Sequence, residues 1–156
     1  MTAIETDRDC FTRFVEEVGP RLTQALVARL GGELGREMAA EALAYGWEHW
    51  DRVGGLDNPA GYLYRVGQNR GRRTRRPYLL PDPPLHKSEP VVEPGLPSAL
   101  AHLSNRQRVS VMLVHGAGWT LTETADFLGI SPGSVYRHVE RGLRLLRRSL
   151  GVTSDA

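Results

Sequence analysis

Seven of the chain's ten prolines lie between residues 77 and 97. Proline fixes φ and has no backbone N–H, so neither a helix nor a central strand can run through such a stretch. We therefore predict two domains, residues 1–76 and 98–156, joined by an extended, semi-stiff linker at 77–97. Each domain is small, so each core must be modest and open to support from a partner.

Apolar residues of the first domain recur at helical spacing, without the alternation that is typical of strands. Those at positions 11, 14, 15 and 18 follow the i, i+3, i+4, i+7 pattern of one buried face. Gly19-Pro20 predicts that this helix is interrupted there. The further expected boundaries are a stop at Gly31-Gly32, a helix from Glu33 to Trp50 that Gly54-Gly55 ends, and a helix capped by Asn58 with Pro59 first.

The second domain has similar start and stop signals. Ser104 and Gln107 have the spacing of a capping box, so we expect a helix to begin there. The later expected boundaries are a break at Gly116 and Gly118, a cap at Thr122, a turn at Gly129, and a long last helix capped by Ser131 with Pro132 first. The predicted fold class is all-α, with two small helical domains and a Pro-rich linker.

Ala125, Gly129 and Val135 are the strongest sequence signal for function. A helix-turn-helix needs a small residue where its helices cross and a glycine at the left-handed turn. It also needs a branched aliphatic residue that packs the second helix onto the first. All three residue types stand at the required offsets, so residues 122–150 are predicted to form this motif.

The last helix is predicted to have two contrasting faces. Its apolar residues are Val135, Val139, Leu143, Leu146 and Leu150. Its opposite face has Ser134, Tyr136, Arg137, Arg141, Arg144 and Arg148, with His138 beside it. Such a helix can place its first residues in a major groove while its arginines contact phosphates. The alternative is a three-helix core with a solvated basic face, and for His138 a phosphate contact and a solvated role both remain open.

A second basic signal lies at the end of the first domain. Residues 61–76 hold six Arg and no acid, whereas residues 1–60 have a net charge of −5. The residues that share one helical face are Tyr62, Arg65, Asn69, Arg72, Arg73 and Arg76. Aromatic, amide and guanidinium groups together suit unstacked bases and their phosphates. Cations that complement a helix C-terminus are the alternative, although six exceed what a helix dipole needs.

The whole plan resembles a bacterial RNA polymerase sigma factor of the extracytoplasmic-function class. Residues 103–108, Leu-Ser-Asn-Arg-Gln-Arg, are similar to the family's Leu-Pro-x-x-Gln-Arg at the start of region four. Residues 121–148 are similar to its helix-turn-helix, and residues 61–69 to its Trp-Leu-x-x-Ile-Ala-x-Asn in region two. The order of the two domains is what selects this family among helix-turn-helix proteins.

The resemblance implies a transcription initiation factor whose region four binds the −35 promoter element and whose region two binds polymerase and melts and captures the −10 strand. The residues implied to face the −35 groove are Ser131, Ser134, Tyr136, Arg137, His138, Arg141 and Arg144. Those implied near the −10 strand are Tyr62, Arg65, Asn69, Arg72 and Arg73. Those implied to bind polymerase, on a helix from Glu37 to Trp50, are Glu37, Glu41 and Trp47.

Four positions depart from the family's pattern. They are Ala40 in place of Gln, Tyr62 in place of Trp, an Arg in place of the Asp commonly found a few residues after Asn69, and Tyr136 in place of Lys. The alternative function is therefore a helix-turn-helix regulator that keeps the fold but does not engage polymerase.

Catalysis is not expected. Cys10 is the sole cysteine, which excludes an internal disulfide and a cysteine-rich zinc site, and the five histidines show no metal-ligand spacing. We expect no cofactor, no metal, no secretory signal and no membrane insertion, and hence a cytoplasmic protein. The partners that the resemblance implies are core RNA polymerase, promoter DNA and, as for many relatives, an anti-sigma factor.

Overall fold

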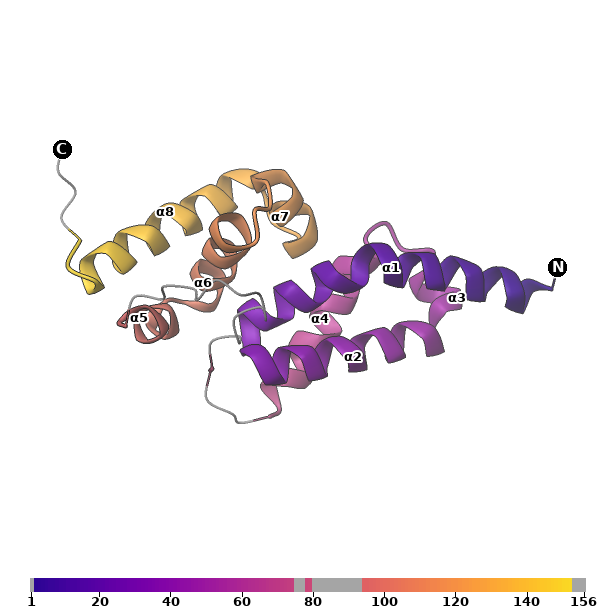
Figure 1. Cartoon of the computed structure of the whole chain (residues 1–156). Coiled ribbons are helices and arrows are strands. Elements are labelled where there is room, and N and C mark those ends of the chain that lie inside the picture. Colours follow the sequence, from indigo (N-terminus) through magenta and orange to yellow (C-terminus); the bar gives the residue numbers. More distant parts are fainter. Residues whose placement is uncertain (1, 75–77, 80–93, 153–156) are drawn as a thin grey trace, which may run out of the picture.

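The computed structural model describes residues 2–74, 78–79 and 94–152, and the elements in these ranges are all helical (Figure 1). They are α1 (Ala3–Leu30), α2 (Gly32–Glu48), α3 (Trp50–Val53), α4 (Pro59–Arg72), α5 (Leu96–His102), α6 (Asn105–Val111), the π-helical turn η1 (Met112–Gly116), α7 (Leu121–Leu128) and α8 (Pro132–Ser149). The all-α prediction is confirmed. None of these helices is long and apolar enough to cross a membrane.

Most of the linker predicted at 77–97 lies outside the described residues, and so do Arg75 and Arg76. The predicted boundaries of the two domains therefore stay predictions. Below, "first segment" means residues 2–74 and "second segment" means residues 94–152.

Helix α1 runs through Gly19-Pro20 without a break, which corrects the predicted interruption. Pro20 removes the helical hydrogen bond to the carbonyl of Glu16, and both residues are exposed, so water can replace the missing donor. On the buried side of the same turns, Leu22 and Leu26 are fully inaccessible to solvent. Burial of this face offsets the cost of about 3 kcal/mol that an interior proline imposes on a helix.

Asn58 has two roles at the start of α4. Its Oδ1 accepts a hydrogen bond from Gly61 N at 3.0 Å, which confirms the predicted cap. Its Nδ2 donates to the carbonyl of Asp126 at 2.7 Å and so ties this cap to α7 of the second segment. The predicted caps Ser104 and Ser131 are also confirmed, at α6 and α8.

The predicted cap at Thr122 is wrong, because Thr120 caps α7 instead. Thr120 Oγ1 accepts from Glu123 N at 3.0 Å, and Glu123 Oε2 accepts from Thr120 N at 3.1 Å. This reciprocal capping box requires a Glu or Gln three residues after the cap. Thr122 has Ala125 at that offset, so it lacks the second half of the motif.

Helices α7 and α8 form the predicted helix-turn-helix. Gly129 ends α7 with a φ of 71°, a left-handed conformation that favours glycine. Its N–H donates to the carbonyl of Ala125 at 2.9 Å. Ala125 and Val135 are almost fully buried in one cluster with Val139. The small residue, the turn glycine and the branched aliphatic residue therefore have the packing roles that their spacing predicts.

The two segments share a hydrophobic core. Helices α1, α2 and α4 lie together, and α6 and α7 approach them near the C-terminal half of α1 (Figure 1). Leu22 and Leu26 of the first segment belong to the same buried cluster as Leu113 and Phe127 of the second. Each segment is too small to bury a large core alone, so each gains stability from the other.

Polar contacts reinforce this packing. Arg108 of α6 is 5% exposed, and its Nε and Nη2 donate to the carbonyls of Ala28 at 3.2 Å and Arg29 at 2.9 Å. The last carbonyls of a helix have no partner within the helix, so Arg108 acts as a C-terminal cap that comes from another segment. Trp119, also buried, donates from Nε1 to Gln24 Oε1 at 2.9 Å.

Candidate nucleic-acid interface

The polar face of α8 is open to solvent along its length. Its exposed members are Ser131, Tyr136, Arg137, Arg141 and Arg144, whereas Ser134 and His138 are half-buried. The hydrophobic residues Val135, Val139 and Leu146 of the same helix are buried. The two contrasting faces predicted for this helix are therefore present, and the arginines are not packed inward.

Hydrogen bonds orient side chains at the start of this face. Ser131 Oγ lies 2.9 Å from Ser134 Oγ, and Arg137 Nη2 donates to Ser134 Oγ at 3.1 Å. Further along, Tyr136 donates its hydroxyl proton to Glu140 Oε1 at 3.0 Å while its ring stays exposed. The first turns of α8 thus present hydroxyl and guanidinium groups in a defined arrangement.

His138 lies beside these arginines. Burial is the main reason that the pKa of His138 lies below its usual value, and the nearby charges of Arg106, Arg141 and Arg137 lower it further. A lowered pKa means that the neutral imidazole is favoured over the charged one. His138 therefore adds a hydrogen-bonding group to this face, and its lowered pKa disfavours the charged form.

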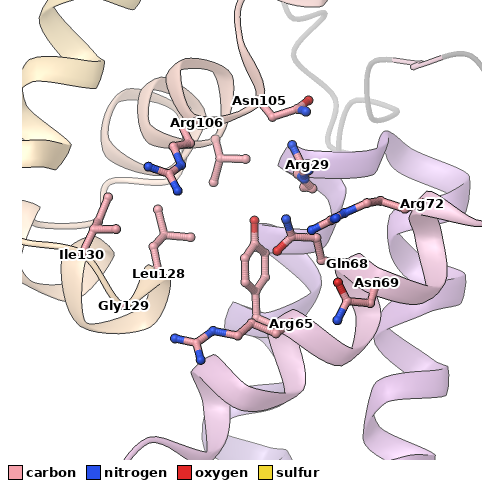
Figure 2. Close-up of a pocket in the computed structure, with 12 residues that line it drawn as sticks. Arg29, Arg65, Gln68, Asn69, Arg72, Asn105, Arg106, Leu128, Gly129 and Ile130 are labelled. Carbon is pink, nitrogen blue, oxygen red and sulfur yellow. The ribbon is translucent and has the colours of Figure 1, made fainter.

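The residues of α4 that were predicted near the −10 strand divide between two places. Arg65, Asn69 and Arg72 line a cleft of about 350 Å³ between the two segments (Figure 2). Tyr62 does not line this cleft, and Arg73 is exposed at the C-cap of α4. The other wall of the cleft comes from α6 and the turn between α7 and α8.

Tyr62 belongs to an aromatic and cationic group with Tyr45 and Arg52. The two hydroxyl oxygens lie 3.3 Å apart, and Arg52 Nη2 donates to Tyr45 Oη at 2.6 Å and to Tyr62 Oη at 3.3 Å. The hydrogen bond with Tyr62 is the largest reason that the pKa of Tyr45 lies below its ordinary value. Aromatic rings beside a guanidinium offer a stacking surface for unpaired bases.

The three residues that were predicted to bind polymerase all lie on α2. Glu37 and Glu41 are one helical turn apart on α2, and Glu41 Oε2 pairs with Arg70 Nη1 at 3.4 Å. Trp47 is 43% exposed and packs against Phe11 of α1, with ring centroids 5.3 Å apart. Glu41 and Trp47 thus contact different neighbouring helices, α4 and α1.

Sequence reasoning missed two groups that the fold adds to these surfaces. Tyr45 and Arg52 join Tyr62, and Arg29 and Arg106 join the cleft arginines of α4. Neither Arg29 nor Arg106 stands in an arginine-rich stretch of sequence. Arg29 and Arg106 lie in one cleft only because α6 packs against α1, so no local sequence pattern predicts that they are neighbours.

Tyr64 lines the cleft, with its ring edge-on to Phe127 at 5.7 Å, and burial raises its pKa to about 12. The folded-state pKa of this phenol is therefore higher than its unfolded-state pKa of about 10. Its contribution to stability is complete below pH 10 and is lost as the pH rises towards 12. Between pH 9 and pH 11 we expect the wild type to lose about 1–1.5 kcal/mol more than Tyr64→Phe does. Urea denaturation followed by circular dichroism measures the difference, and equal losses in the two proteins would contradict a buried phenol.

The fold and these surfaces define a class: an all-helical protein with a helix-turn-helix, an exposed basic helix in the second segment and an arginine-rich helix in the first. No group of three or more His, Cys, Asp or Glu side chains within the described ranges is placed to bind a metal ion.

Comparisons with known proteins narrow this class. The family model described as Sigma-70, region 4 matches residues 95–146. In structure the chain is similar to the sigma factor RpoE, from its co-crystal structure with the anti-sigma factor NepR from Bartonella quintana. The TM-score is 0.59 at 19% identity, and the match covers 91% of this chain and 97% of that chain. No curated protein matches the sequence.

These findings support the resemblance to sigma factors. Residues 95–146 are matched as a sigma-70 region 4 domain, and the chain has the all-helical fold of a sigma factor. The region 4 match supports a role in transcription initiation, and the structural similarity shows the fold.

Proposed function

We propose that this protein binds core RNA polymerase and directs it to specific promoters. The observation that supports this most is that the region 4 match, residues 95–146, coincides with a helix-turn-helix whose second helix has an exposed arginine face. The match indicates what kind of domain this is, and the exposed face provides the surface that duplex DNA requires.

In this proposal α8 recognises the −35 element. Ser134 and Arg137 are in its first turns, where a recognition helix contacts base edges in the major groove. Arg141 and Arg144 lie further along the exposed face, where they contact phosphates and fix the register of the protein on DNA.

The first segment captures the melted −10 strand. Tyr62 and Tyr45 offer rings for unstacked bases, and the arginines of α4 offer charge for phosphates. Arg65, Asn69 and Arg72 line a cleft against the second segment, and we infer that the two segments move apart to give a strand full access to them. Separation of the segments is therefore part of the proposed mechanism.

Run-off transcription with core polymerase and a library of genomic fragments tests this function. We expect transcripts from a limited set of start sites that depend on the added protein. The same core enzyme without the protein is the control. A protein that binds core polymerase but yields no new start site would contradict the proposal.

A regulator that does not engage polymerase is the second candidate. The observation that favours it is that Glu41, one of the residues implied to bind polymerase, pairs with Arg70 in this structure. Both side chains are more than 40% exposed, so this ion pair is weak and a partner can displace it. Failure to co-purify with core polymerase, with duplex binding intact, would support the regulator.

An anti-sigma protein is a further proposed partner. The structurally similar sigma factor is described in complex with one, the factor NepR. The acidic residues 1–60 and the basic face of α8 offer opposite charges to such a protein.

Arg137→Ala is expected to weaken binding to a promoter duplex by about 1–3 kcal/mol. A side chain that reads a base makes this contact only at the cognate sequence, so the variant loses affinity mainly there. Binding to random DNA should change much less. Arg144→Ala is the matched control: it should weaken both duplexes equally and reduce the salt dependence of binding. Fluorescence anisotropy with both duplexes at several salt concentrations measures this. Equal loss at specific and random DNA for Arg137→Ala would show that Arg137 contacts no base.

A further inference from the structure

The cleft between the two segments is lined by several arginines. Among the described residues, its charged members are Arg29 of α1, Arg65 and Arg72 of α4, and Arg106 of α6, and none of these lining residues is Asp or Glu. The salt bridges found among the described residues involve Arg21 and Arg70, not these four. Figure 2 shows Arg29 and Arg72 near one another on one wall, with Arg106 facing them from the other segment. A cleft lined by one sign of charge attracts ions of the opposite sign.

The environment of Arg29 in this cleft is unfavourable for its positive charge. Its Nε is buried, and no described residue forms a hydrogen bond with it. Burial is the largest reason that the pKa of Arg29 lies below its ordinary value, and the charges of Arg108, Arg72 and Arg106 lower it further. These guanidinium groups therefore repel one another, and an anion among them would relieve the repulsion.

Arg65 approaches the opposite wall at the helix-turn-helix. A Cβ atom placed on Gly129 would lie 2.8 Å from Arg65 Nη2, so the guanidinium lies directly against the turn. The positive groups are thus spread around the cleft, which suits a ligand with several anionic groups. A guanidinium fork binds phosphate through two parallel hydrogen bonds.

The remaining lining suits the uncharged part of such a ligand. Gln68, Asn69 and Asn105 supply amides that both donate and accept hydrogen bonds, and Tyr64 and Ile130 supply apolar surface. The volume of about 350 Å³ lies at the lower end of the range for small-molecule sites.

We propose that this cleft binds a small polyphosphorylated molecule through arginines of both segments, and that the bound ligand favours the closed arrangement. The ligand links α4 to α6, so it opposes the separation of the segments that the proposed function includes. In this last respect the inference rests on the proposed function, whereas binding itself requires neither DNA nor polymerase.

Isothermal titration calorimetry of the full chain with inorganic tripolyphosphate tests the site. We expect saturable binding to the wild type and a loss of about tenfold or more in affinity for both Arg72→Ala and Arg106→Ala, since a charged hydrogen bond accounts for about tenfold or more. Arg147→Ala, which removes an exposed α8 arginine outside the cleft, is the control and should change affinity less than about twofold. Circular dichroism of each variant verifies that it is folded.

The outcomes separate the possible ligands. A nucleoside triphosphate that binds more tightly than tripolyphosphate would assign the site to a nucleotide, and equal affinity would assign it to inorganic polyphosphate. No saturable binding, or equal loss in the Arg106 and Arg147 variants, would overturn the proposal. A short single-stranded oligonucleotide that binds more tightly than either ligand and depends on Arg106 would assign the cleft to DNA and would also overturn it. None of these results depends on transcription, so a failed promoter assay does not affect them.

Discussion

Replacing Arg108 with methionine should lower the free energy of unfolding by about 2–5 kcal/mol, because it leaves two buried carbonyl groups without donors. The side chain caps Ala28 and Arg29 at the end of α1, as described above, and its Nη2 also donates to Asn105 Oδ1 at 2.7 Å. The ring of Tyr78 lies 4.1 Å from the guanidinium carbon. Methionine has a similar length but can supply none of these donors.

The same substitution should loosen the contact between the segments before the helices unfold. Trp119 reports this, because its indole is buried and bonded to Gln24 across the contact. We expect a red shift of tryptophan emission at denaturant concentrations where helicity, followed by circular dichroism, is still complete.

Two further variants make the Arg108 experiment specific. Arg108→Lys keeps the charge but loses the planar fork, so we expect it to recover only part of the stability. Arg13→Ala removes an exposed arginine of α1 and should change stability by less than about 0.5 kcal/mol. If Arg108→Met were as stable as Arg13→Ala, the capping role of Arg108 would be wrong.

The second large effect is expected for Gly35→Ala at the crossing of α1 and α2. A Cβ atom on Gly35 would lie 2.4 Å from Val27 Cα and 2.6 Å from Val27 N. These neighbours are backbone atoms, so no side-chain rotation can relieve the overlap. We expect a loss of about 3 kcal/mol or more, the upper end of the cost of overpacking a core, measured by urea denaturation.

Gly116→Ala is the matched control for this substitution. A Cβ atom on Gly116 would have no neighbour within 4 Å. The change should therefore be small, or stabilising by up to about 1 kcal/mol through the unfolded chain. Wild-type stability in Gly35→Ala would show that α1 and α2 do not approach as closely as the structure has them.

The features that sequence determined by itself are those that depend on neighbouring residues. The caps at Asn58, Ser104 and Ser131 and the left-handed turn at Gly129 follow from side chains and backbone freedom within a few positions. The spacing of apolar residues in α8 likewise predicts its buried and exposed faces, because a helix repeats every 3.6 residues. These local rules are enough to predict the fold class and the helix-turn-helix.

Tertiary structure alone decided the rest. Helix α1 continues through Pro20 because its buried face gains more from packing than the proline costs, a balance that no local pattern reveals. Arg108 is a buried cap, and Arg29 and Arg106 share a cleft with the arginines of α4, only because α6 packs on α1. These tertiary contacts join residues that are far apart in the chain. The energy of each contact depends on burial and distance, which sequence spacing does not specify.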